Sequence, residues 1–257
     1  MIAGTLGPVA LAFSICSLGR PWVQYHPDGT NSKAIFITDP VWLITLNAIQ
    51  LGVGVLSNIF LLLHMARRVR FTIAQPITII GWYVSAICLV SLHATAAGPL
   101  LNGLEHPINN IVWSQAFYYG IWAAILYFID ASLMAITFWG ALYGHYENDF
   151  NLTRSQRTLM LQTMMFLTFV LLGALVFSKI ENWDYLDGVY WADVTLFTVG
   201  FGDYVVTTTL SRALLFPYAL VGITSLGLVV ASIQNMVLER GGRRLDARVE
   251  EKAVVKY

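Results

Sequence analysis

Charge is scarce in this chain of 257 residues, of which only 12% are Asp, Glu, Lys or Arg. A typical soluble domain has roughly twice that share, about 25%. Apolar residues make up 57%, and the mean hydropathy is +0.64. A soluble protein of this size could not keep so much apolar surface away from water. The composition therefore argues against a soluble enzyme, a disordered protein and a disulfide scaffold, and it predicts that lipid surrounds much of the chain.

Cysteine and an excess of basic charge are also missing. The two cysteines, Cys16 and Cys88, lie within apolar runs and are typical of small buried residues, without the spacing of a zinc site. Fifteen basic residues balance fifteen acidic ones, which argues against nucleic acid as a partner. No nucleophile–base pair or metal-ligand set suggests an enzyme, so we expect neither an enzymatic activity nor a cofactor.

Long apolar runs, by contrast, fill the sequence. A bilayer core of about 30 Å requires about 20 apolar residues in a helix. Five runs reach this length, and a shorter sixth at the start has no charge, so we expect six transmembrane helices. The expected spans are 2–18, 41–64, 76–97, a core within 111–143, 158–177 and 210–238. A cleaved signal peptide is the alternative for 2–18, although no basic residue opens it.

The loop charges predict an orientation. Eleven Lys and Arg residues lie in the loops at 65–75, 144–157 and 239–257, against four on the opposite side. By the positive-inside rule this places both termini in the cytoplasm of a multi-pass protein, which we expect in the plasma membrane. On the outer side, Glu181, Asp184 and Asp187 cluster before a half-apolar segment, 186–204, too polar to cross. They form either a solvated loop or an outer vestibule that attracts cations.

The segment 198–203 reads Thr-Val-Gly-Phe-Gly-Asp and resembles the signature of potassium channels. A potassium ion in a narrow pore must exchange its water for other oxygens, and backbone carbonyls from four equivalent loops can supply them. Glycine at alternate positions permits the dihedral angles that aim successive carbonyls at one axis. The resemblance implies K⁺ as the permeant ion, bound by the carbonyls of Thr198, Val199, Gly200 and Phe201 and the Thr198 hydroxyl.

The residues around this motif have expected supporting roles. Gly202 and Asp203 close the segment, and 188–197 would form a re-entrant pore helix whose C-terminal end faces the ion. On that helix Trp191 is expected to brace the filter. Asp193 is an acid at membrane depth and needs a hydrogen-bonding partner.

Residues 192–196, which include Asp193 and Thr195, resemble the first pore of the fungal outward-rectifying two-pore (TOK-type) potassium channels, as do Gly7-Pro8-Val9 near the start. The resemblance implies an outwardly rectifying, potassium-selective channel. Members have eight spans and two pores, whereas this sequence has one motif. We therefore expect a fragment or a divergent six-span relative, acting as a homotetramer if complete or a dimer if a second pore follows. The alternative is a non-conducting accessory subunit that modifies full-length two-pore channels.

The expected fold is thus an all-α membrane protein in which the last two of six helices flank a pore helix and filter. It divides into a four-helix region (1–142), a cytoplasmic linker (143–157), a pore module (158–238) and a cytoplasmic tail (239–257). The fourth span has no Arg or Lys and one charge, Asp130, so it is not an arginine-ladder voltage sensor. In the last span Pro217, Gly222 and Gly227 mark either a gating hinge or close helix packing, and Gly241-Gly242 is expected to end the helix.

Overall fold

The computed structural model describes residues 2–27, 34–66, 68–101, 110–143 and 154–254, with the backbone alone described for 2, 154, 239, 240 and 242–254. Most of this part of the chain is helical. The elements are α1 (Ile2–Cys16), β1 (Val23–Tyr25), β2 (Ile35–Ile37), α2 (Val41–Met65), α3 (Phe71–Thr95), η2 (Ala96–Leu100), β3 (Ile111–Trp113), α4 (Gln115–Leu142), α5 (Arg154–Glu181), α6 (Tyr185–Leu196) and α7 (Thr209–Val254).

Five helices of the described residues are long and apolar enough to cross a membrane: α2, α3 with η2, α4, α5 and α7. This confirms the prediction of a mostly helical, multi-pass membrane protein. The sixth expected crossing corresponds to α1, whose 15 residues cover only about 23 Å at 1.5 Å per residue. Six full crossings therefore stay a prediction.

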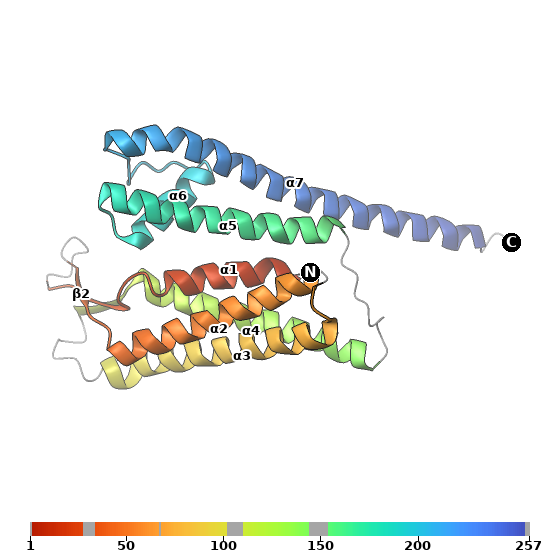
Figure 1. Cartoon of the computed structure of the whole chain (residues 1–257), viewed down its shortest axis with the longest axis horizontal. Coiled ribbons are helices and arrows are strands. Elements are labelled where there is room, and N and C mark those ends of the chain that lie inside the picture. Colours follow the sequence, from red (N-terminus) through yellow and green to blue (C-terminus); the bar gives the residue numbers. More distant parts are fainter. Residues whose placement is uncertain (1, 28–33, 67, 102–109, 144–153, 255–257) are drawn as a thin grey trace.

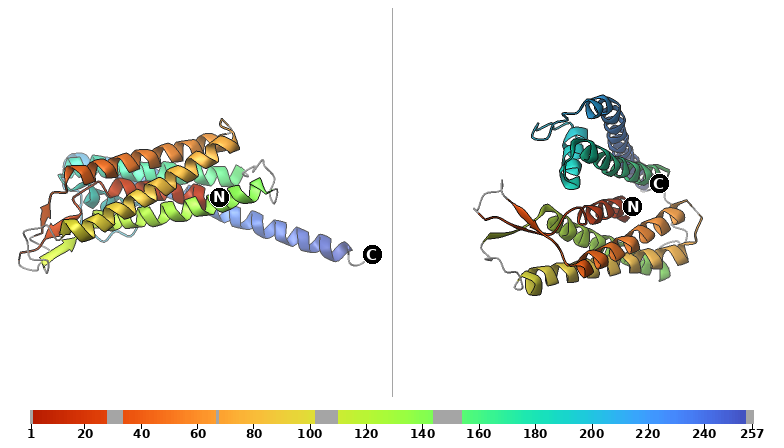
Figure 2. Two further views of the ribbon diagram at one scale, coloured as in Figure 1. Left: turned by 90° about the horizontal axis from the view of Figure 1, so that it is seen from below. Right: turned by 60° about the vertical axis from the view of Figure 1, so that its left-hand side comes forward.

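The helices form two groups that meet at α1 (Figure 1). On one side α2 and α4 pack against α3, and on the other α6 lies against α5 and α7. The α1 helix packs on α2, α4 and α5, so it joins the two groups. The far half of α7 extends beyond all other elements (Figure 2).

A small antiparallel sheet, in the order β2-β1-β3, lies at one end of the group formed by α1, α2, α3 and α4, called the four-helix group below (Figure 1). Val23 pairs with Ile37 and with Trp113, so the sheet fastens the α1–α2 connection to the segment before α4. The expectation of an all-helical fold is wrong in this detail. Each strand has only three residues, too short a run to show the alternation that marks a strand in sequence.

Two helix boundaries differ from expectation. The α6 helix begins at Tyr185, three residues before the predicted start, because Asp184 takes the extended conformation of an N-cap residue. The α7 helix continues to Val254, so the prediction that Gly241-Gly242 ends it is wrong. Glycine weakens a helix by about 1 kcal/mol without forcing it to stop.

The interior of the four-helix group is partly polar. The Gln50 side chain on α2 donates a hydrogen bond of 2.8 Å to the Ser14 hydroxyl on α1. The backbone carbonyl of Gln50 accepts one of 3.1 Å from the Ser85 hydroxyl on α3. Such bonds hold helices together where lipid removes the hydrophobic drive for association. Asp130 on α4 is fully buried, and neither carboxylate oxygen has a hydrogen-bond partner in the described part of the chain.

Candidate functional site

The backbone between α6 and α7 has an unusual alternation of dihedral angles. Thr198, Gly200 and Gly202 have φ values of 59°, 63° and 78°, whereas Val199 and Phe201 between them do not have positive φ. A left-handed residue at every second position allows successive carbonyl oxygens to face the same side of the strand. Thr198 is notable because β-branched residues rarely adopt positive φ. Nothing in the sequence around Thr198 predicts this conformation, because glycine is the residue that normally adopts it.

Hydrogen bonds to the end of α6 fix the start of this segment. The Val194 carbonyl accepts from the amides of Val199 (2.9 Å) and Gly200 (3.2 Å), and the Thr195 carbonyl accepts from Thr198 (3.1 Å). Three amides therefore bond back to the helix.

The segment is open to its surroundings within one chain. Val199 is 53% exposed and Phe201 is 70% exposed. An added Cβ on Gly200 or Gly202 would meet no atom within 4 Å. The large apolar side chains of this segment are thus left uncovered by the chain that carries them.

Aromatic packing holds the end of the segment that follows Asp203. Asp203 accepts a hydrogen bond of 3.1 Å from the Tyr204 amide. The Tyr204 ring packs edge-on against Trp183 at 5.4 Å and against Tyr190 of α6 at 6.2 Å between centroids. Partial burial and the nearby Asp187 carboxylate raise the pKa of Tyr204, so this hydroxyl keeps its proton at neutral pH. The sequence prediction missed both tyrosines, because nothing in their spacing indicates which side chains they contact.

Trp191 lies away from the segment that it was expected to brace. It is buried, and its ring packs on Phe177 of α5 at 4.4 Å, on Trp183 at 5.7 Å and on Tyr218 of α7 at 6.0 Å between centroids. Within one chain it therefore holds α6 between its two flanking helices. A brace to Phe201 of a neighbouring copy stays a prediction.

Asp193 is partly buried on α6. No hydrogen bond to its carboxylate is found among the described residues, although we expected a partner. Thr195 contributes through its carbonyl, as described above.

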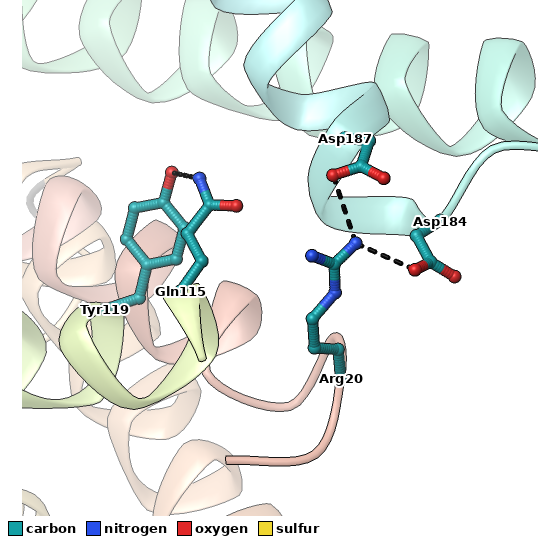
Figure 3. A network of polar contacts seen from close by, with 5 residues as sticks. All are labelled: Arg20, Gln115, Tyr119, Asp184 and Asp187. Atoms are coloured by element: carbon teal, nitrogen blue, oxygen red, sulfur yellow. Dashed lines mark hydrogen bonds and ion pairs between the residues drawn. The ribbon is translucent and has the colours of Figure 1, made fainter. Parts of the chain in front are cut away.

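The three outer acids are already engaged within the chain. Glu181 accepts hydrogen bonds from Thr207 and Thr208, at 2.6 to 3.0 Å, and from the Ser211 hydroxyl, and so connects α5 to the start of α7. Asp184 and Asp187 form ion pairs with Arg20 at 2.8 and 3.0 Å (Figure 3). These contacts leave less free negative charge for the vestibule role, which stays a prediction.

The three hinge candidates lie within one continuous helix, α7. A Cβ on Gly222 would overlap the buried Leu196 side chain at the end of α6, so close packing explains this glycine. A Cβ on Gly227 would meet nothing within 4 Å. Packing within the chain gives no reason for Gly227, and the hinge role of Gly227 and Pro217 stays a prediction.

Comparisons with known proteins relate this region to ion channels. The profile of the family described as "Ion channel" matches residues 165–239, which run from α5 through the filter segment into α7. The chain is 37% identical over 99 residues to the mouse protein "Potassium channel, subfamily K, member 16", covering 33% of this chain and 34% of that protein. It is 58% identical over 40 residues to the human "Potassium channel subfamily K member 17", covering 16% of this chain and 12% of that protein.

The mouse "Potassium channel subfamily K member 4" is 42% identical over 69 residues, 24% of this chain and 17% of that protein. The chain therefore matches about a third or less of the length of these relatives. No solved structure matches significantly. The family profile covers the part of the chain with the alternating dihedral angles, and this part is similar to an ion-channel domain.

Proposed function

We propose that this chain supplies the pore of a potassium-selective channel and that K⁺ crosses the membrane passively through it. The observation that carries the proposal is the alternation of φ across Thr198–Gly202, in a segment whose sequence is that of a potassium filter. The carbonyls of Thr198, Val199, Gly200 and Phe201 bind the dehydrated ion, with the Thr198 hydroxyl as a further ligand. Gly202 and Asp203 support them from the outer end.

The pore requires more than one copy of the segment. A dehydrated ion needs oxygens on all sides, and one strand offers them on one side. The exposure of α7 supports this requirement. Only 6% of the residues in its apolar stretch are buried, against 33–39% in the other four helices of the described residues that could span a membrane. We propose a homo-oligomer with closed symmetry around the filter, a tetramer if this chain acts alone or a dimer if the native chain carries a second pore.

The finer properties follow from the family resemblance and the loop charges. We propose outward rectification, because the fungal two-pore channels that the sequence resembles have it. We also propose six crossings with both termini in the cytoplasm. In this orientation the filter segment and the sheet belong to the outer side, at the opposite end from the projecting half of α7 (Figure 1).

Whole-cell recording from cells that express this chain tests the proposal. We expect a current that reverses near the K⁺ equilibrium potential and follows it when external K⁺ is changed. A current that passes Na⁺ as readily as K⁺ would contradict the assignment of the filter. Surface-expressed protein without current, which alters the current of a co-expressed full-length two-pore channel, would instead favour the accessory-subunit role.

A further inference from the structure

Arg20 joins the two helix groups at the outer end of the molecule (Figure 3). Its Nη2 atom lies 2.8 Å from Asp184 Oδ2 and 3.0 Å from Asp187 Oδ1, and both acids belong to the start of α6. The Arg20 side chain is only 13% exposed, and its guanidinium also lies 5.1 Å from the centre of the Phe36 ring. The pairs thus connect residues 164 and 167 positions apart in a partly dry setting.

Arg20 is carried by a firmly anchored segment. The indole N–H of Trp22 donates to the Ser17 carbonyl at 2.8 Å, and its amide donates to Asp39 at 3.0 Å. The Trp22 ring stacks on His93 of α3 at 4.2 Å. Because these contacts fix the chain two residues from Arg20, the position of its guanidinium follows that of the four-helix group.

The acids on the other side lead to the filter segment. Tyr204 directly follows Asp203, and its ring packs edge-on against Trp183 at 5.4 Å and against Tyr190 at 6.2 Å between centroids. Trp183 immediately precedes Asp184, and Tyr190 lies about one helical turn after Asp187 on α6. Apolar contact supports the same junction: a Cβ on Gly19 would lie 2.9 Å from the buried Leu186 side chain, so the backbone next to Arg20 touches α6.

We propose that Arg20 is a positioning residue for the outer end of the filter, acting through Asp187 at the start of α6 and the packing of Tyr204 on Trp183 and Tyr190, so that the arrangement of the first four helices determines how firmly the filter is held. This rests on the proposed potassium-channel function. The two acids contribute unequally. Asp184 is 60% exposed and its pair is screened by water, whereas Asp187 is 24% exposed and its pair is screened less. Asp187 is therefore the effective partner.

Two measurements on the full chain in membranes test this: the K⁺-over-Na⁺ permeability ratio, and amide hydrogen exchange of a peptide covering 198–208. Arg20→Gln and Asp187→Asn should lower the permeability ratio and speed exchange by about fivefold each, the change expected for losing about 1 kcal/mol of restraint. Asp184→Asn should have a smaller effect. Lys179→Gln is the matched control, since it removes one positive charge at the outer end of α5 without breaking an ion pair of the described residues, and it should change neither measurement.

A charge exchange separates positioning from a general loss of stability. Arg20→Asp alone should have a larger effect than Arg20→Gln, because it places a third carboxylate beside Asp184 and Asp187, and adding Asp187→Arg should restore both measurements towards the wild-type values. The proposal would be overturned if the 198–208 peptide kept its wild-type rate of hydrogen exchange in every variant. It would also be overturned if the double variant with reversed charges restored neither measurement. If wild-type protein conducts no K⁺ yet exchange responds as described, the coupling holds and the proposed function fails.

Discussion

Replacing Gly200 by Ala tests whether the left-handed backbone of the filter segment is required. Gly200 has φ of 63° and its added Cβ would meet no atom within 4 Å of the same chain, so the expected cost within one chain is conformational and not a collision. A left-handed alanine costs about 1–2 kcal/mol. If four filter segments must adopt this conformation together, the cost is about 4–8 kcal/mol for the pore. At 1.4 kcal/mol for each factor of ten, the conducting conformation becomes about 10³ to 10⁶ times rarer.

The assay is the K⁺ current at matched surface expression, with Gly52→Ala as the control. Gly52 is exposed on α2, and its added Cβ also meets no atom within 4 Å, but it has an ordinary helical backbone. Alanine there should leave the current unchanged, because it favours the helix by about 1 kcal/mol. Wild-type current and selectivity in Gly200→Ala would refute the reasoning, since the alternation of φ could then not be what forms the conduction path.

Three further substitutions test other parts of the structure through the thermal unfolding midpoint of the purified protein. Gly188→Ala should lower it, by an overpacking cost of about 1–3 kcal/mol, because the new Cβ would lie 2.8 Å from the Ala174 carbonyl oxygen between α5 and α6; an unchanged midpoint would show that these helices can separate freely. Glu181→Gln should also lower it and speed hydrogen exchange at the start of α7, because an amide cannot accept from all the donors that now surround the carboxylate; unaltered exchange there would contradict this role of Glu181. Asp130→Asn should keep or raise the midpoint, since a buried carboxyl without donors gains nothing from its charge; a clear decrease would mean that the carboxylate has a favourable partner.

The apolar runs predicted the long helices because a bilayer imposes a length on each of them that the sequence must satisfy locally. The start of α2 at Val41 was predicted correctly for this reason. The start of α6 was not, because it depends on the extended backbone of Asp184 and not on an apolar boundary. The sheet was missed because three-residue strands are stabilised by pairing between loops far apart in sequence, such as Val23 with Trp113.

The unusual backbone of 198–202 could be anticipated from sequence because glycine spacing records backbone requirements, and Gly200 and Gly202 do have positive φ. The side chains around it were harder to predict. Trp191 packs between α5 and α7, and Glu181 binds the start of α7, because a tertiary contact gives each a partner that its own neighbourhood does not reveal. The ion pairs of Arg20 could not be predicted for the same reason, since the acids belong to a different helix group.

The distribution of exposed apolar side chains indicates where further copies of the chain would meet. The α7 helix packs mainly on α5 and α6. Its side chains Phe216 and Leu220 are 74% and 58% exposed, and Phe201 of the filter segment is 70% exposed. Lipid can cover an apolar helix, but it cannot supply hydrogen-bonding groups or ligands around the filter segment. The partners of the polar backbone groups in that segment must therefore come from protein and from the ion. We expect neighbouring copies to pack against α6, α7 and the filter, which leaves the four-helix group at the periphery, connected to the pore by α1 and Arg20.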